Sequence, residues 1–119
     1  MTSLPEPPPA ERALHTARAA VLHDLTATGH TDPGTVSLLD HAVSDRRWWV
    51  GEWPAGAPYA TALVAQDVVD GLLERVGRWP CCPMHAEEPL VVEPPLGEDP
   101  SWVCAQCGPI ATVGGLDRT

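Results

Sequence analysis

The chain has 119 residues, enough for one domain or for one domain with a small satellite. Its formal net charge of -9, from 16 acidic residues and 7 arginines, argues against nucleic acid as a partner, because phosphate binding relies on clustered basic side chains. No stretch reaches the roughly 18 consecutive apolar residues of a membrane span, and residues 1–9 do not form a secretory signal, so we expect a cytoplasmic protein with no membrane partner.

Residue usage shapes the first expectations. The absence of Lys, Asn and Phe beside plentiful Ala, Gly, Pro and Arg indicates a GC-rich genome, and it leaves tryptophan to fill large aromatic core positions. Residues 1–9 carry four prolines, which deny the backbone both helical and sheet hydrogen bonds. We therefore expect a disordered Pro-rich tail over residues 1–9.

A first helix is predicted from Ala10 onwards. Glu11 lies in its first turn, where the helix dipole favours an acidic residue, and Gly29 is a suitable stop. Apolar residues at helical spacing predict one buried face, made of Leu14, Ala17, Val21, Leu22 and Leu25.

A second helix is predicted to begin at Pro33, with Asp32 as its N-cap. Its buried face is predicted from Val36, Leu39 and Val43. The apolar stripe favours helix to about Trp49, and a short strand over residues 48–53 is the alternative. A loop rich in Gly and Pro is expected over residues 53–58.

The third predicted helix opens at Pro58 and ends at Gly77. It has the broadest apolar face, made of Ala62, Ala65, Val69, Leu72, Leu73 and Val76. Three amphipathic helices in succession indicate a small helical bundle, which we assign to a domain over residues 10–79.

Helical periodicity stops after residue 79, because prolines divide the remaining chain into short pieces. Apolar runs at residues 90–93, 101–103 and 110–113 predict short antiparallel strands. A unit of fewer than roughly 40 residues rarely folds without a disulfide or a metal. We therefore predict an α+β protein in which a helical bundle precedes a cross-linked unit over residues 80–116, with residues 117–119 as a short tail.

Two pairs of metal-binding side chains supply that cross-link. Cys82 and His85 form one pair and Cys104 and Cys107 the other, each spaced by two residues as suits a tight turn that directs both side chains at one ion. Gly108 permits a positive φ after the second pair. Three thiolates and one imidazole fill a tetrahedral shell, so we predict one structural Zn²⁺ and no catalytic metal.

The segment Cys104-Ala-Gln-Cys107-Gly108 resembles a rubredoxin-type zinc knuckle, and together with Cys82-Pro-Met-His85 it resembles the zinc ribbons. The resemblance covers residues 80–116 and implies two knuckles at the tips of β-hairpins that clamp one zinc ion. It departs from the commonest pattern because His85 stands where Cys is usual and the first knuckle has no trailing glycine.

Cys81 leaves alternatives open. It can replace Cys82 as the ligand, remain a buried free thiol, or serve as a redox-sensitive thiol beside the metal. We favour Cys82 as the ligand because its spacing to His85 matches that of the other knuckle. Two disulfides require an oxidising compartment and leave His85 unexplained, and an iron–sulfur cluster usually takes four thiolates.

A second candidate site is a tryptophan–arginine segment made of Arg46, Arg47, Trp48, Trp49 and Trp53. We favour core packing, in which these tryptophans seal the bundle against the zinc ribbon and Trp79 and Trp102 do so from the other side. The alternative is an exposed docking surface, since Trp and Arg are common at binding hot spots.

The sequence has no recognisable catalytic motif, and the spacing of its remaining histidines, His15, His23, His30 and His41, favours surface or capping roles over a second metal site. We therefore expect a non-catalytic, zinc-stabilised module that binds another protein. A zinc ribbon associated with nucleic acid or transcription and a redox sensor using Cys81 are the alternatives.

Overall fold

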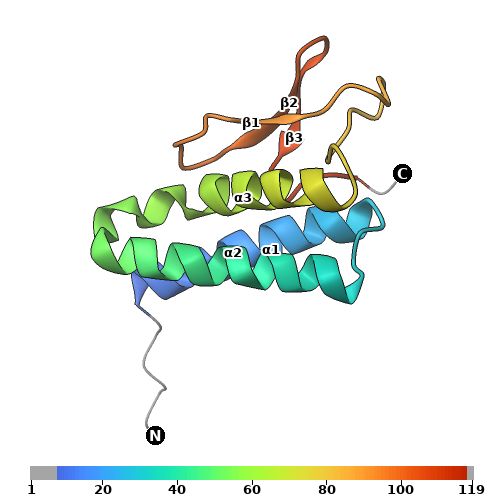
Figure 1. Cartoon of the computed structure of the whole chain (residues 1–119). Helices are drawn as coiled ribbons and strands as arrows, with labels where there is room; N and C mark the ends of the chain where they lie inside the picture. The colour runs from blue at the N-terminus through green and yellow to red at the C-terminus, as the bar shows by residue number, and fades with distance from the viewer. Residues whose placement is uncertain (1–7, 118–119) are drawn as a thin grey trace, which may run out of the picture.

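The chain forms three helices followed by a small antiparallel sheet, as seen in a computed structural model that describes residues 8–117 (Figure 1). The helical elements are α1 (Pro9–Ala27), α2 (Pro33–Glu52), the 3₁₀ helix η1 (Pro54–Tyr59) and α3 (Ala60–Arg75). The strands are β1 (Val91–Glu93), β2 (Ser101–Cys104) and β3 (Gly108–Thr112). The predicted α+β class is confirmed.

The two predicted tails lie almost entirely outside the described residues. Of the tail expected over residues 1–9, the structure describes Pro8 and Pro9, and Pro9 is already the first residue of α1. Of the tail expected over residues 117–119, it describes Asp117.

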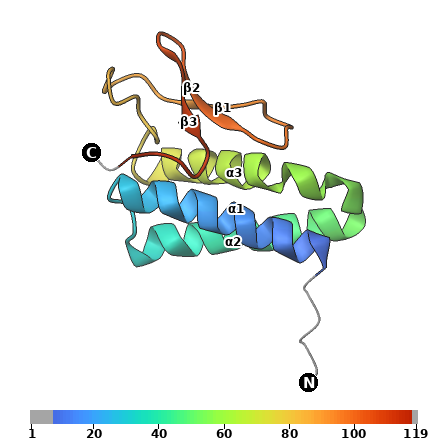
Figure 2. The same ribbon diagram turned by 180° about the vertical axis from the view of Figure 1, so that it is seen from behind.

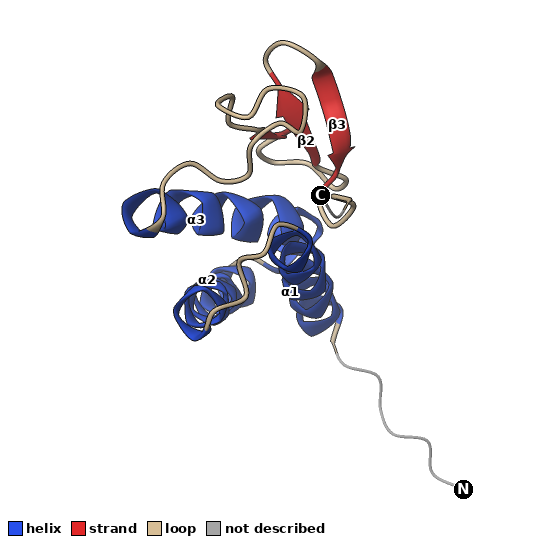
Figure 3. Cartoon of the chain, turned by 90° about the vertical axis from the view of Figure 1, so that its right-hand side faces the viewer, coloured by secondary structure: helices blue, strands red, loops and turns tan. Residues whose placement is uncertain are grey.

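The helices form one layer and the sheet forms a second. The sheet lies on the side of the helical layer made by α1 and α3, and α2 is the helix farthest from it (Figures 2 and 3). The strand order is β1-β2-β3, and both pairs are antiparallel. Val92, Trp102 and Ala111 face one another across the strands, and Val92 and Trp102 are buried beneath the sheet.

Helix boundaries follow local chemistry. Asp32 is the N-cap of α2, where its carboxylate accepts hydrogen bonds from the Thr35 backbone N–H (3.1 Å) and hydroxyl (2.8 Å). Gly29 and Gly77 follow α1 and α3 with φ of 77° and 103°, which glycine adopts without a side-chain clash. The predicted capping residues are thus confirmed.

The favoured helix to about Trp49 is confirmed, since α2 continues to Glu52 without a strand. The segment expected to be a loop is η1, so α3 begins at Ala60 and not at Pro58 as predicted. The predicted buried face of α3 is correct in part: Ala62, Ala65 and Leu72 are buried, whereas Leu73 is 57% exposed and Val76 is 52% exposed. Near its C-terminal end, α3 has apolar residues on more sides than the neighbouring elements cover. The spacing of these residues does not reveal which of those sides is buried.

A single hydrophobic core joins the two layers. It extends from Leu14, Val21 and Leu72 in the helices to Trp102 and Leu116 in the C-terminal layer. The domain division at residue 79 remains a prediction, and the two units share this core. Within residues 8–117, no helix combines the length and the apolar character that crossing a membrane requires.

Candidate metal centre

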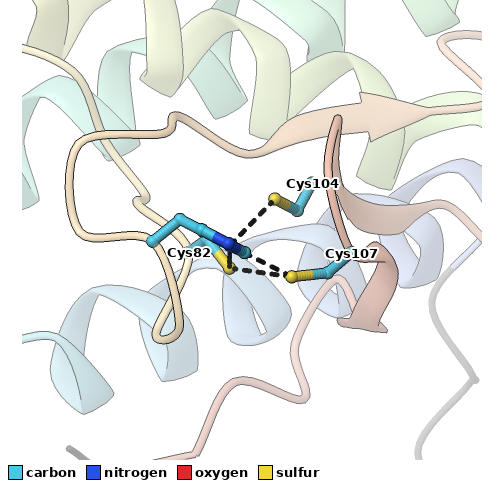
Figure 4. Close-up of side chains that lie close together, drawn as sticks. Cys82, Cys104 and Cys107 are labelled. Carbon is cyan, nitrogen blue, oxygen red and sulfur yellow. Dashed lines mark hydrogen bonds between the residues drawn. The ribbon is translucent and has the colours of Figure 1, made fainter.

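Four metal-binding side chains converge between the loop after α3 and the β2–β3 turn. Cys82 and His85 come from the loop, Cys104 is the last residue of β2, and Cys107 lies in the turn before β3. The three cysteine side chains point toward a common centre (Figure 4). All four ligand atoms lie within 4.8 Å of one another, so the structure brings together the four residues predicted from the sequence.

The spacing of these atoms suits tetrahedral coordination. Zinc bonds of about 2.3 Å to sulfur and about 2.0 Å to nitrogen place two sulfurs about 3.8 Å apart and a sulfur about 3.5 Å from a nitrogen. Cys82 Sγ and Cys107 Sγ are 3.8 Å apart. His85 Nδ1 lies 3.7 Å from Cys82 Sγ, 4.0 Å from Cys104 Sγ and 3.2 Å from Cys107 Sγ. The set therefore fits one ion, with Nδ1 as the imidazole donor.

Backbone hydrogen bonds hold both turns in place. In the first turn, His85 N–H donates to the Cys82 carbonyl (3.2 Å) and Cys82 N–H donates to the Glu88 carbonyl (2.9 Å). In the second turn, Gln106 N–H donates to Cys104 Sγ (3.4 Å), and Gly108 has a φ of 84°. The positive φ that the sequence predicted for the glycine after the second pair is therefore confirmed.

The thiols of Cys104 and Cys107 differ in how readily they ionise. Burial alone would raise the pKa of Cys104, but backbone N–H groups of Cys107 and Gln106 and the neighbouring thiols lower it overall, because they stabilise the thiolate. Burial, followed by the hydrogen bonds and charges of Cys82 and Cys104, raises the pKa of Cys107 to about 11. Adjacent sulfurs cannot all ionise cheaply without a cation between them.

Solvent exposure also differs across the cluster. Cys82 is 2% exposed and Cys104 is 1% exposed, so both belong to the shared hydrophobic core, whereas Cys107 is exposed and His85 is half-buried. The cluster is thus anchored on its inner side by two core cysteines and open to solvent on its outer side.

Cys81 lies outside the cluster. Its thiol is half-buried and contacts the Arg78 carbonyl at 3.6 Å, and its backbone pairs with Pro89 in an isolated bridge. It lines a small cavity of about 240 Å³ together with Thr28, Pro83 and Ile110. Of the two vicinal cysteines, Cys82 is therefore the one directed at the metal centre; a redox role for Cys81 stays a prediction.

The C-terminal layer is attached to α1 by Asp24, which is fully buried. The Asp24 carboxylate accepts hydrogen bonds from Trp102 Nε1–H (2.7 Å) and from the backbone N–H groups of Gly114 (2.6 Å) and Leu116 (3.0 Å). His23 Nδ1 lies 3.0 Å from the same carboxylate. The sequence does not reveal this anchor, because an acidic residue on an amphipathic helix ordinarily faces solvent.

Trp79 and Trp102 occupy the place predicted for them between the two layers. Their rings meet edge to face with centroids 5.5 Å apart, and both side chains are buried. Trp79 Nε1–H donates to the Thr28 hydroxyl at 2.8 Å, which satisfies its polar group and ties it to the end of α1.

The tryptophans of the tryptophan–arginine segment do not seal the bundle against the sheet, so that prediction was wrong. They lie at the end of α2 and beside η1, away from the loop between α3 and β1 (Figure 1). Trp48 is 71% exposed and Trp53 is 46% exposed, while Trp49 packs edge to face on Trp53 at 5.0 Å. The long α2 carries these side chains beyond the region that the sheet covers.

The two arginines of this segment pair within the helical layer. Arg46 donates two hydrogen bonds to the Asp67 carboxylate, at 2.7 and 2.8 Å, and lies 5.7 Å above the Trp49 ring. Arg47 donates to Glu11 at 2.8 Å. Their role in a docking surface stays a prediction.

Comparison with known proteins identifies the family. The family described as "Domain of unknown function (DUF8819)" matches residues 10–113, which include α1 apart from its first residue, the other helices, all three strands and the four residues of the metal cluster. The chain belongs to this family. No curated protein and no solved structure matches it. The matched residues span both layers and most of their shared core, and the core residue Leu116 lies just beyond them.

Proposed function

We propose that Cys82, His85, Cys104 and Cys107 hold one structural zinc ion, and that the protein is a non-catalytic, cytoplasmic module that binds another protein. The observation that carries the zinc assignment is the convergence of three sulfurs and one imidazole nitrogen at tetrahedral spacing. Soft thiolates with one imidazole are the donors of structural zinc. The likeness of both turns to the knuckles of zinc ribbons supports the same assignment.

A structural role follows from the number of donors. A catalytic zinc site keeps one position for water or substrate, whereas four protein ligands fill a tetrahedral shell. The ion would then supply cross-linking free energy to strands of three to five residues, which are too short to order themselves.

Reduced thiols and a metal agree with a cytoplasmic setting better than disulfides do. Cys82 Sγ and Cys107 Sγ are 3.8 Å apart, well beyond a disulfide bond of about 2.0 Å. The reducing cytoplasm favours this state.

Two features support the interaction role. Four protein ligands leave no open metal position for catalysis, and the chemistry of the surface suits a protein partner. The net charge of -9 favours a basic partner and disfavours nucleic acid. The exposed Trp48 and Trp53 offer one surface of the kind that protein partners use.

Elemental analysis of the purified full chain tests the metal assignment, and we expect one zinc ion per chain. Affinity capture from a native lysate tests the interaction, with Cys104→Ser protein as the comparison. We expect a partner protein to be retained by the zinc-loaded chain and lost with the variant. Metal-free, intact protein would overturn the zinc assignment, and zinc-loaded protein that retains no partner would overturn the interaction role.

A further inference from the structure

The C-terminal layer carries charge of one sign. Residues 80–117 contain no arginine or lysine, and their acidic side chains are Glu87, Glu88, Glu93, Glu98, Asp99 and Asp117. In the part of the chain that the structure describes, none of these carboxylates pairs with an arginine. This layer therefore presents an uncompensated negative surface.

The helical layer differs, because four of its arginines pair with carboxylates of the same layer. Arg18 pairs with Asp40 at 2.7 Å, Arg46 with Asp67 at 2.7 Å and Arg47 with Glu11 at 2.8 Å. Arg75 lies 3.6 Å from Asp32. The negative field that a partner meets is consequently concentrated on the sheet side of the molecule.

The outward face of the sheet is apolar at its centre. Residues alternate between the two faces of a strand, so Val91, Val103 and Pro109 form a row opposite the buried row of Val92 and Trp102. Val91 is 49% exposed, Pro109 is exposed and Val103 is half-buried. The face points away from the helices (Figure 3).

A groove runs beside this row. It has a volume of about 510 Å³ and is lined by Glu93, Pro94, Pro95, Ser101, Val103 and Pro109. Valine and proline supply most of its lining, and Glu93 is its one acidic residue. A groove of this composition suits an apolar side chain flanked by a cation.

We propose that this outward sheet face, defined by Val91, Glu93, Val103 and Pro109 together with the groove, binds a basic segment of another protein that carries apolar side chains between its arginines or lysines. The proposal rests on the proposed interaction role and names its surface and partner. Charge complementarity selects the occupant: uncompensated carboxylates attract a cationic segment and repel nucleic acid, an anionic membrane and a second copy of this acidic chain.

The metal centre positions this surface. Val103 immediately precedes Cys104 on β2, and Pro109 follows Cys107 and Gly108 at the start of β3. The row of Val91, Val103 and Pro109 is therefore in register only when the turn that carries the two cysteines is ordered. Binding at this face should require the zinc-loaded chain.

Selection from a library of random short peptides on the immobilised, zinc-loaded full chain tests the proposal. We expect peptides that combine Arg or Lys with apolar residues, and we expect their binding to weaken as salt rises. Glu93→Arg and Val91→Ser should each weaken a selected peptide about tenfold. Glu52→Arg is the matched charge control at the end of α2 and should leave its binding unchanged, whereas Trp48→Ser tests the exposed tryptophan surface as the rival binding site.

Zinc content and tryptophan fluorescence show whether each variant is folded, and both altered positions are solvent-exposed. Peptides that are not basic, or that lose binding with Trp48→Ser instead of Val91→Ser, would overturn the sheet-face proposal while leaving an interaction role intact. A library that yields no peptide at all would overturn the sheet-face proposal, and partner capture from the lysate would still decide the interaction role separately.

Discussion

The helical layer, residues 9–75, and the C-terminal layer, residues 79–116, differ in what holds their backbones. The helices have 19, 20 and 16 residues, apolar faces at helical spacing, and ion pairs between their exposed faces. The strands have three, four and five residues, and four metal-binding side chains join the turns beside them. Order in the first layer comes from local repetition, and order in the second comes from contacts between distant residues.

The boundary between the layers shows that the C-terminal layer also depends on the helices. Asp24 and Thr28 on and beside α1 accept the indole N–H groups of Trp102 and Trp79. The segment after β3 returns to α1 through Gly114 and Leu116. The proposed zinc ion would therefore complete a layer that is already attached to the helices at one side.

Removing the metal should produce the largest difference in behaviour between the two layers. Structural zinc contributes on the order of 10–16 kcal/mol of apparent binding free energy in small zinc peptides. Chelation or Cys104→Ser should therefore disorder residues 80–116 while circular dichroism retains most of the helical signal. Hydrogen exchange resolved along the chain measures both effects, and added zinc should reverse chelation. Unchanged exchange in residues 80–116 after complete zinc removal would contradict this expectation.

Asp24→Ala should have the next largest effect, because it leaves the buried N–H groups of Trp102, Gly114 and Leu116 without their acceptor. Loss of a buried charged acceptor costs about 3–5 kcal/mol in the free energy of unfolding. Urea denaturation of the zinc-loaded protein measures the change.

Asp24→Asn should cost less, since the amide oxygen still accepts one of these bonds. Asp70→Ala is the matched control: Asp70 is exposed on α3 and, among residues 8–117, accepts only from Gln66, so its loss should change the free energy of unfolding by no more than about 0.5 kcal/mol. Equal effects at the two positions would show that Asp24 does not anchor the layers.

The pH dependence of zinc binding should follow from the protons that the thiols release. The Cys107 thiol keeps its proton at neutral pH, whether its pKa is the ordinary value of 9.0 or the raised value of about 11, so zinc must displace that proton. Each proton released makes the binding constant fall about tenfold per unit decrease in pH. Competition with a chelator at several pH values measures the slope, and a flat profile between about pH 6 and 8 would contradict the expectation.

The features that the sequence predicted are those encoded within a few residues. The N-cap at Asp32, the glycine stops and the paired metal donors each have a local chemical signature, and the structure has all of them. Even the two distant halves of the metal cluster were predictable, because each half carries its own spacing and only one plausible partner exists in the chain.

The features that the sequence did not reveal depend on which surfaces are covered. Asp24 has the spacing of a solvent-facing residue, and only the returning segment after β3 makes it a buried acceptor. Trp48 is large and apolar, yet α2 projects it beyond the sheet. In both cases the outcome depends on where a distant segment of the chain packs, which residue spacing does not record.

Cys81→Ser should have the smallest effect, and it sharpens the assignment of the two vicinal cysteines. Because the Cys81 thiol contacts the Arg78 carbonyl and lies outside the metal cluster, the variant should bind one zinc ion with unchanged affinity. Cys82→Ser is the matched comparison and should lose zinc, since Cys82 Sγ lies 3.7 Å from His85 Nδ1 within the cluster. If Cys81→Ser lost zinc and Cys82→Ser kept it, Cys81 would be the zinc ligand in place of Cys82. If Cys81→Ser retains zinc but no longer responds to peroxide, the redox-sensor alternative is favoured. The variant would then have removed only the reactivity of a thiol outside the metal cluster.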